Sequence, residues 1–145
     1  MNTCPKGLLT PQELVEAEEL WIIDTQIMLK NESNLKVWQK QFDLFADDNG
    51  LIRCRGRLDN ANLPYATKYP LFLPRKAHFT TLVVKRAHCR IMHNGVRETL
   101  TEIRRRYWIV KGCSLVRSII HYCVTCKRHE GASFKTPLPP ALPAF

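Results

Sequence analysis

The 145-residue sequence lacks a long apolar segment and a secretory leader. No run of 18 apolar residues occurs, so no stretch predicts a membrane-spanning helix. The first 20 residues contain no apolar signal core and become acidic at once, which argues against a signal peptide. We therefore expect a protein of the nucleus or cytoplasm that is not secreted. In such a compartment the six cysteines should be reduced thiols or metal ligands, and not a disulfide framework.

Acidic residues are scarce in the second half of the chain, which is therefore strongly basic. Residues 75–145 contain 14 Lys/Arg and three acids (Glu98, Glu102 and Glu130), a net charge of +11, whereas residues 1–74 have a net charge of −2. A basic half of this kind favours a polyanionic partner, most often nucleic acid, over a merely solvated surface.

Residues 1–76 predict an N-terminal extension, an α+β unit of two helices and a small antiparallel sheet. Thr10-Pro11-Gln12-Glu13 combines a capping box with proline at the first helical position, so the first helix should begin here and run to about Lys30. The residues near helical spacing on its expected core face are Leu14, Ala17, Trp21 and Met28. A second short helix follows Ser33, and its expected core face consists of Leu35, Trp38 and Phe42.

Alternating apolar residues after position 42 predict the sheet. The segment FDLFADDNGLIRCRGRL (42–58) has apolar residues on both sides of Asn49-Gly50, a dipeptide typical of hairpin turns because both residues tolerate positive φ. YPLFLP (69–74) predicts a third short strand. Arg53, Arg55 and Arg57 alternate along the second strand, where a solvated face is the simpler interpretation and a basic stripe the alternative. Nothing in residues 1–76 indicates an active site.

Residues 77–130 predict a small bundle of three helices. Its expected core positions are Phe79, Leu82, Val83, Ala87 and Ile91 in the first helix, Val96, Leu100 and Ile103 in the second, and Leu115, Val116, Ile119 and Ile120 in the third. His93-Asn94-Gly95 and Lys111-Gly112 separate the helices. Residues 131–145 predict a stiff proline-rich linker. A ligand for a PxxP-binding domain is the less favoured interpretation, because such spacings arise freely in linkers.

Two pairs of metal-ligating residues bracket this bundle: His88 with His93, and Cys123 with Cys126. Three short helices bury too little apolar surface to be stable alone, and structural zinc contributes about 10–16 kcal/mol of apparent binding energy in small peptides. Residues five apart on a continuous helix differ by about 140°, so the chain must leave the helix after His88, and Asn94-Gly95 is where it can turn. Two imidazoles and two thiolates close a tetrahedral shell, which predicts structural and not catalytic Zn²⁺.

Other interpretations of these residues are weaker. A redox Cys-x-x-Cys would be expected within a thioredoxin-like βαβ pattern, which is absent. Each histidine taken alone would more often be an ordinary surface or core residue. The remaining His and Cys residues of this half are not assigned to the metal, and they are His78, Cys89, Cys113, His121 and His129.

The spacing of several residues around the two pairs resembles a known family. The residues concerned are His88-x4-His93-x-Gly95, Thr99-Leu100, Ile103-Arg104, Tyr107-Trp108-Ile109, Val116-Arg117 and Cys123-x2-Cys126. Together they resemble the HHCC zinc-binding domain of retroelement integrases, most of all those of Bel/Pao-type LTR retrotransposons. GLIRCRGRLDNANLPYATKYPLFLPRK (50–76) is similar to the segment that such polyproteins carry between ribonuclease H and integrase. Cys113 departs from the family, which often has Arg there.

The resemblance implies a helix-turn-helix-like bundle, with His88, His93, Cys123 and Cys126 holding structural zinc. It also implies that the tail leads toward a separate catalytic core whose three carboxylates bind magnesium. Because the sequence ends at Phe145 without such a core, we expect no catalysis of integration by this chain. A fragment of a polyprotein, or a degraded or domesticated copy, is the expected origin.

The favoured function is a zinc-stabilised module that binds DNA weakly through its phosphates and supports integrase assembly. The cations expected to contact nucleic acid are Arg97, Arg104, Arg105, Arg106, Lys111, Arg117, Lys127 and Arg128. The alternative is a protein-interaction or oligomerisation module without DNA binding of its own, with other integrase subunits or domains as partners. A hydrolytic zinc enzyme is least favoured, because four protein ligands leave no open position on the metal.

Overall fold

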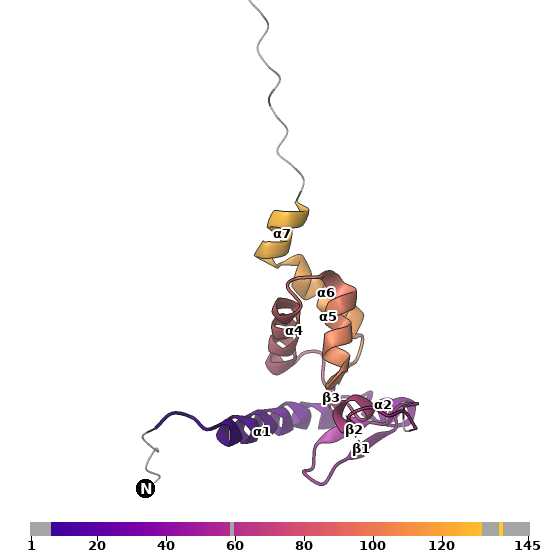
Figure 1. Cartoon of the computed structure of the whole chain (residues 1–145). Helices are drawn as coiled ribbons and strands as arrows, with labels where there is room; N and C mark the ends of the chain where they lie inside the picture. Colours follow the sequence, from indigo (N-terminus) through magenta and orange to yellow (C-terminus); the bar gives the residue numbers. More distant parts are fainter. Residues whose placement is uncertain (1–6, 59, 132–136, 138–145) are drawn as a thin grey trace, which may run out of the picture.

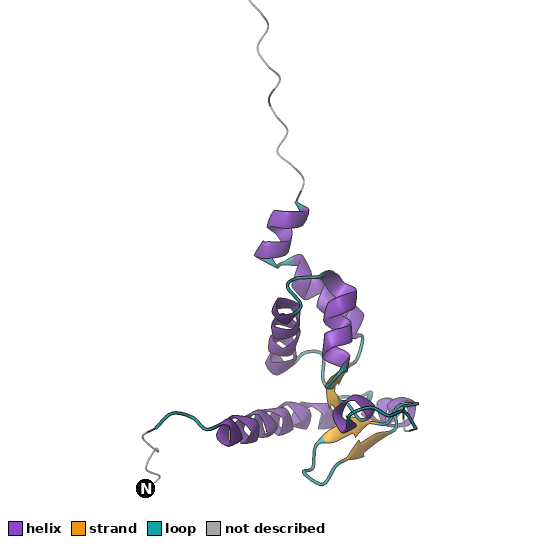
Figure 2. Cartoon of the chain, viewed as in Figure 1, coloured by secondary structure: helices purple, strands orange, loops and turns teal. Residues whose placement is uncertain are grey.

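The computed structural model describes residues 7–58, 60–131 and 137, and this part of the chain is a mixture of helices and one four-stranded sheet (Figures 1 and 2). In chain order the elements are α1 (Pro11–Lys30), α2 (Leu35–Phe42), β1 (Leu44–Ala46), β2 (Ile52–Cys54), α3 (Tyr65–Lys68), β3 (Leu71–Leu73), α4 (His78–Arg90), α5 (Gly95–Arg104), β4 (Tyr107–Ile109), α6 (Gly112–His121) and α7 (Val124–Glu130). No helix among the described residues has both the length and the hydropathy needed to cross a lipid bilayer. The proline-rich linker predicted over 131–145 lies outside the described residues except for Gly131 and Pro137.

Helix α1 begins and ends where the sequence predicts. The Glu13 backbone N–H donates to the Thr10 hydroxyl over 3.3 Å, and the Thr10 backbone N–H donates to the Glu13 carboxylate over 2.7 Å, which completes the capping box. These hydrogen bonds hold the pKa of Glu13 below its ordinary value. The helix ends at Lys30, as expected.

The core face predicted for α1 is wrong. Leu14, Trp21 and Met28 are each about half exposed, and Ala17 is exposed as well. The residues that α1 buries are Ile22, Thr25, Gln26 and Leu29. Apolar side chains occur on several sides of this helix, so their spacing does not identify which side packs against the protein.

The predicted hairpin and third strand are confirmed. Strands β1 and β2 pair antiparallel with Phe45 opposite Arg53, and β2 pairs antiparallel with β3 through Arg53 and Leu71. Between β1 and β2, Gly50 has φ of +76°, whereas Asn49 does not adopt positive φ. The loop is held by the Asp47 carboxylate, which accepts from the backbone N–H groups of Asn49 and Leu51.

The fourth strand comes from the predicted bundle and joins the two halves of the chain. Strand β4 pairs parallel with β3, with Leu71, Phe72 and Leu73 opposite Tyr107, Trp108 and Ile109. This strand was not predicted, because Tyr107-Trp108-Ile109 directly follows the apolar periodicity of α5. Helices α3 and α7 were not predicted either, so residues 77–130 contain four helices and not the expected three. The boundary predicted between residues 76 and 77 stays a prediction, but one sheet crosses it.

One hydrophobic core also crosses this boundary. Its buried residues come from α1, the sheet, and α4 to α6, and they include Ile22, Leu73, Phe79, Val84 and Val116. The core positions expected in α5 and α6 all take part in it, as buried or partly buried side chains. Figure 1 shows α4, α5 and α6 standing on the layer formed by α1 and the sheet, with α7 at the far end.

A smaller cluster lies on the other side of the sheet. Leu29, Cys54 and Phe72 form its buried centre, and the side chains predicted for the inner face of α2 pack against them, namely Leu35, Trp38 and Phe42. The prediction for α2 is therefore confirmed. Phe72 is fully buried and contacts the rings of both Trp38 and Phe42, at centroid distances of 5.9 and 5.8 Å.

The buried side chain of Gln26 connects α1 to two strands. Its amide nitrogen donates to the carbonyl oxygens of Ile52, over 2.8 Å, and Phe72, over 2.9 Å. Its amide oxygen accepts from the Ile52 backbone N–H over 2.8 Å. Strands β2 and β3 share little backbone pairing of their own, so this side chain supplies much of the polar connection between them and the helix.

Replacing Gln26 with the similarly sized Leu should lower the free energy of unfolding by at least ~2 kcal/mol, because each buried backbone group left without a partner costs roughly 1–3 kcal/mol. Urea unfolding followed by circular dichroism measures the change. Gln12→Leu, at an exposed position of the same helix, is the matched control and should alter stability by less than ~0.5 kcal/mol. Equal stability of the two variants would contradict the role given to Gln26.

Candidate metal centre

His88 and His93 are brought together by the way helix α4 ends. The helix continues to Arg90, and the chain then turns through Met92 and His93, whose φ angles are +53° and +62°. The His93 backbone N–H donates to the His88 carbonyl, and the Met92 N–H donates to the Cys89 carbonyl, each over 3.0 Å. This pair of bonds is a Schellman motif. The turn therefore comes slightly before the predicted Asn94-Gly95, although Gly95 also has positive φ.

The Schellman motif folds the second imidazole back over the first. His93 Nδ1 lies 2.9 Å from His88 Nε2, and the two rings are nearly perpendicular at 84°. The histidines thus present different ring nitrogens to the same point. The physical requirement derived from the sequence, that the helix must end between these residues, is met by two consecutive residues in the left-handed conformation.

Cys123 and Cys126 lie at the start of α7, which follows α6 after one turn. Cys123 is the N-cap residue of α7, and Cys126 is buried in its first turn. Backbone N–H groups at the start of this helix, first that of Cys126 and then that of Thr125, stabilise the Cys123 thiolate and lower its pKa. The pKa of Cys126 is raised, because burial and the neighbouring Cys123 disfavour a second thiolate. A bound cation would offset that repulsion and allow both thiolates to form.

The four side chains meet at one point with separations that suit zinc. His88 Nε2 lies 3.2 Å from Cys126 Sγ, and His93 Nδ1 lies 3.4 Å from Cys123 Sγ and 3.9 Å from Cys126 Sγ. All four ligand atoms lie within 4.8 Å of one another. A tetrahedral shell with ordinary Zn–N and Zn–S bonds places its donors about 3.3–3.8 Å apart. The three His–Cys separations lie close to this range, whereas the two imidazole nitrogens, 2.9 Å apart, would move slightly apart around an ion. The donor set is that of a closed N₂S₂ zinc site.

Thr99 orients the buried His88 ring, a role that was not predicted from the sequence. Its hydroxyl lies 3.3 Å from His88 Nδ1 and donates its own hydrogen to the Gly95 carbonyl over 2.6 Å. The hydroxyl is therefore an acceptor toward the ring, so Nδ1 carries the hydrogen and Nε2 is left free for a metal. Burial and the nearby His93 also lower the pKa of His88, which keeps the ring neutral. Two sequence signals pointed to Thr99: the spacing Gly95-x3-Thr99, one helical turn, and its place among the positions that resemble the integrase family.

Thr99→Val keeps the shape of this side chain but removes the acceptor for His88 Nδ1–H, so zinc affinity should fall about 10–100-fold. Competition with a chromophoric chelator at fixed pH measures this affinity. Thr101→Val, an exposed neighbour on the same helix, is the matched control and should leave affinity unchanged. Cys126→Ser, which removes a ligand sulfur, sets the lower limit of binding. If Thr99→Val bound zinc as tightly as Thr101→Val does, the orienting role would be refuted.

The structure separates these four residues from the other candidates. In residues 7–58 and 60–131, they are the one group of His, Cys, Asp and Glu found close enough to hold a metal ion. The unassigned side chains of His78, Cys89, Cys113, His121 and His129 are all exposed outside it.

The cations expected to contact nucleic acid are exposed but lie on different elements. Arg97 and Arg104 are on α5, Arg105 and Arg106 follow it, Lys111 precedes α6, Arg117 is on α6, and Lys127 and Arg128 are on α7. Two of them pair with acids: Arg105 with Glu102 at 3.1 Å and Arg106 with Glu18 at 3.6 Å. The cation of Arg104 lies 5.6 Å above the ring centroid of Trp108.

Comparison with known proteins identifies the class of the metal-binding segment. Residues 76–131 match the family model of the integrase zinc binding domain. This segment is less than half of the chain and contains both His and both Cys residues of the group. No curated protein and no solved structure matches the chain. The family match and the His₂Cys₂ group together make structural zinc the cofactor of this segment.

Proposed function

We propose that this chain is the zinc-binding module of an LTR-retroelement integrase, of the Bel/Pao type, preceded by the segment that links it to ribonuclease H. In this role it would support binding of the element's DNA and assembly of the integrase. The observation that carries the proposal is the convergence of two histidines and two cysteines within a segment that matches the integrase zinc binding family. The upstream motif resemblance supports the narrower assignment to Bel/Pao elements.

In this proposal His88 Nε2, His93 Nδ1 and the sulfurs of Cys123 and Cys126 are the zinc ligands. Zinc bound by four side chains serves as a structural cross-link, because it retains no open position for water or substrate. The ligand pairs tie the end of α4 to the start of α7, at the end of the bundle farthest from the sheet (Figure 1). The metal thereby fixes the helices that present the cations.

DNA binding rests on the excess of positive charge in residues 75–145 and on its exposure. The eight proposed contact residues are all solvent exposed, and they would neutralise phosphates without selecting sequence. Ion pairs with Glu102 and Glu18 reduce what Arg105 and Arg106 can offer. Arg97 and Arg117 have no such pairing among the described residues, so they are the better sites for a test.

The zinc-loaded chain should bind duplex DNA with an affinity that falls steeply with salt, with a log–log slope of about −3 or steeper, because several phosphate contacts release counterions. Arg97→Ala with Arg117→Ala should weaken binding and reduce the slope by about 1–2. Removing zinc with a chelator should abolish binding together with the folded bundle.

Lys36→Ala with Lys40→Ala removes the same charge from exposed positions on α2 and is the matched control. Fluorescence anisotropy from 50 to 300 mM salt measures all three proteins. A salt-independent affinity, or equal losses in the two double variants, would contradict the proposed DNA contacts.

A second candidate function is assembly through α1, and a specific observation favours it. Large apolar side chains on this helix are about half exposed or more: Leu14, Val15, Leu20, Trp21, Ile27 and Met28. The N-terminal half of α1 extends beyond the rest of the protein (Figure 1). Exposed apolar patches on a helix of this length are typical of protein–protein contacts. Another integrase subunit is the partner that the proposed function implies.

Self-association of the zinc-loaded chain, without DNA, should therefore depend on the outer side of α1. Leu20 and Ile27 are seven residues apart and so share one side of the helix. Replacing both with Lys should weaken dimerisation at least 10-fold in sedimentation equilibrium. Val37→Lys, an equally drastic change at an exposed position of α2, should have little effect. A wild-type chain that stays monomeric at 100 µM, or equal weakening by Val37→Lys, would exclude this surface as the dimer contact.

A further inference from the structure

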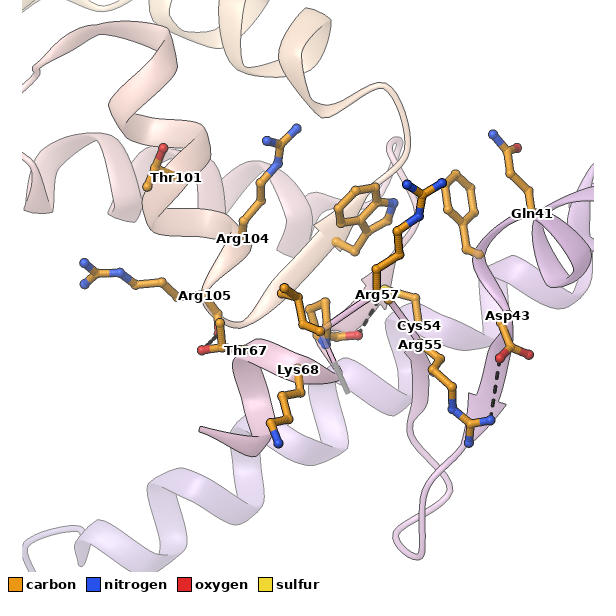
Figure 3. Close-up of a pocket in the computed structure, with 15 residues that line it drawn as sticks. Gln41, Asp43, Cys54, Arg55, Arg57, Thr67, Lys68, Thr101, Arg104 and Arg105 are labelled. Atoms are coloured by element: carbon orange, nitrogen blue, oxygen red, sulfur yellow. Dashed lines mark hydrogen bonds and ion pairs between the residues drawn. The ribbon is translucent and has the colours of Figure 1, made fainter. Parts of the chain in front are cut away.

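A cavity of about 700 Å³ lies at the seam between the N-terminal half and the bundle. Its walls come from the end of α2, the segment after β2, α3, α5 and β4, so neither half forms it alone (Figure 3). Its volume lies within the range typical of small-molecule sites, about 300–1,000 Å³. This seam cavity does not include any of the four zinc ligands.

Aromatic side chains line the seam cavity. Phe42 and Trp108 both line it, with ring centroids 5.8 Å apart. Phe42 is supported from behind by the buried ring of Phe72, and Trp108 by its place in β4. The Arg104 guanidinium lies over the Trp108 ring, 5.6 Å from its centroid. Aromatic rings and guanidinium planes are the two surfaces on which unpaired nucleobases stack in proteins.

The rim of the seam cavity is strongly basic. Its charged residues are the cations Arg55, Arg57, Lys68, Arg104 and Arg105 and the single acid Asp43. Asp43 is paired with Arg55 at 3.6 Å, and Arg105 is paired with Glu102 at 3.1 Å, so the positive excess on which the rim can rely comes from Arg57 and Arg104. In Figure 3 the side chains of Arg57 and Arg104 extend in the same direction, whereas those of Lys68 and Arg105 extend away from them. Arg57 comes from the half of the chain that has a net negative charge, so the general basic character of residues 75–145 does not account for its place at this rim.

We propose that the seam cavity binds an unpaired nucleotide of a single-stranded nucleic acid, with its base against Trp108 and its phosphate between Arg57 and Arg104. The inference rests on the proposed nucleic-acid function and adds the kind of strand that is recognised. A duplex hides the faces of its bases within the stack, so only an unpaired nucleotide can use aromatic and cationic groups together. The positive charge of the rim favours an anionic ligand over a cationic or neutral one.

The first test follows the indole N–H signals of the zinc-loaded chain by NMR during titration with dT8, rU8 or an eight-residue poly-glutamate peptide. The Trp108 signal, identified by its loss in Trp108→Phe, should shift with dT8 or rU8, and the two oligonucleotides show whether DNA or RNA is preferred. The Trp21 signal, from a half-exposed ring on α1 that packs against Phe79 and does not line the cavity, should not move. An unmoved Trp108, or an equal shift with poly-glutamate, would overturn the proposal.

The second test compares two double variants with the same loss of charge. Arg57→Ala with Arg104→Ala should weaken single-strand binding about 10-fold. It should weaken binding to a duplex of equal length by only about 3-fold, the loss expected for Arg104 as one of the eight proposed duplex contacts. Arg97→Ala with Arg117→Ala should weaken binding to both by similar factors. Circular dichroism and zinc content confirm that each variant is folded. If the first pair weakened both substrates equally, the seam cavity would be a source of charge only and the inference would be wrong.

The two proposals fail in different ways. If duplex binding remains steeply salt dependent while Trp108 is unmoved, the single-strand site alone is refuted. If duplex binding is weak and independent of salt, the proposed DNA function is refuted.

Discussion

The constraint on which the zinc segment depends is that two imidazoles five residues apart must reach one metal ion. A continuous helix would point them about 140° apart, so α4 has to end between them. It does so through a Schellman motif in which Met92 and His93 adopt positive φ. Neither residue is glycine, and a non-glycine residue in the left-handed region is disfavoured by roughly 1–2 kcal/mol. The free energy of zinc binding is larger than this cost, so a bound ion would stabilise the left-handed conformation.

The zinc end of the bundle is linked to the N-terminal half through a short path of packed elements. Thr99 holds His88 from α5, and α5 leads through Arg105 and Arg106 into β4. Strand β4 completes the sheet that Gln26 connects to α1. A hydrophobic core runs alongside this path and contains buried residues from both the N-terminal half and the bundle.

This arrangement determines which surfaces remain available. The side of α1 that carries Ile22 and Leu29 is used by the core, which leaves other apolar side chains of the same helix facing solvent. The contact between the two halves also forms the seam cavity. Arg57 and Arg104, which are far apart in the sequence, lie at the same basic rim of this cavity. Binding and assembly surfaces therefore arise from the junction as well as from the zinc segment.

The sequence by itself determined the features that depend on near neighbours: the capping box of α1, the hairpin around Gly50, helices α4 to α6, and the ligand pairs His88/His93 and Cys123/Cys126. These follow from short-range spacing and backbone preference. Only the tertiary structure decided which side of α1 is buried, that Tyr107–Ile109 is a strand, and that Thr99 and Gln26 bind distant groups. Each of those features depends on a contact with a residue farther along the chain. The local sequence around an apolar or polar side chain does not specify which distant residue it will pack against or bond to.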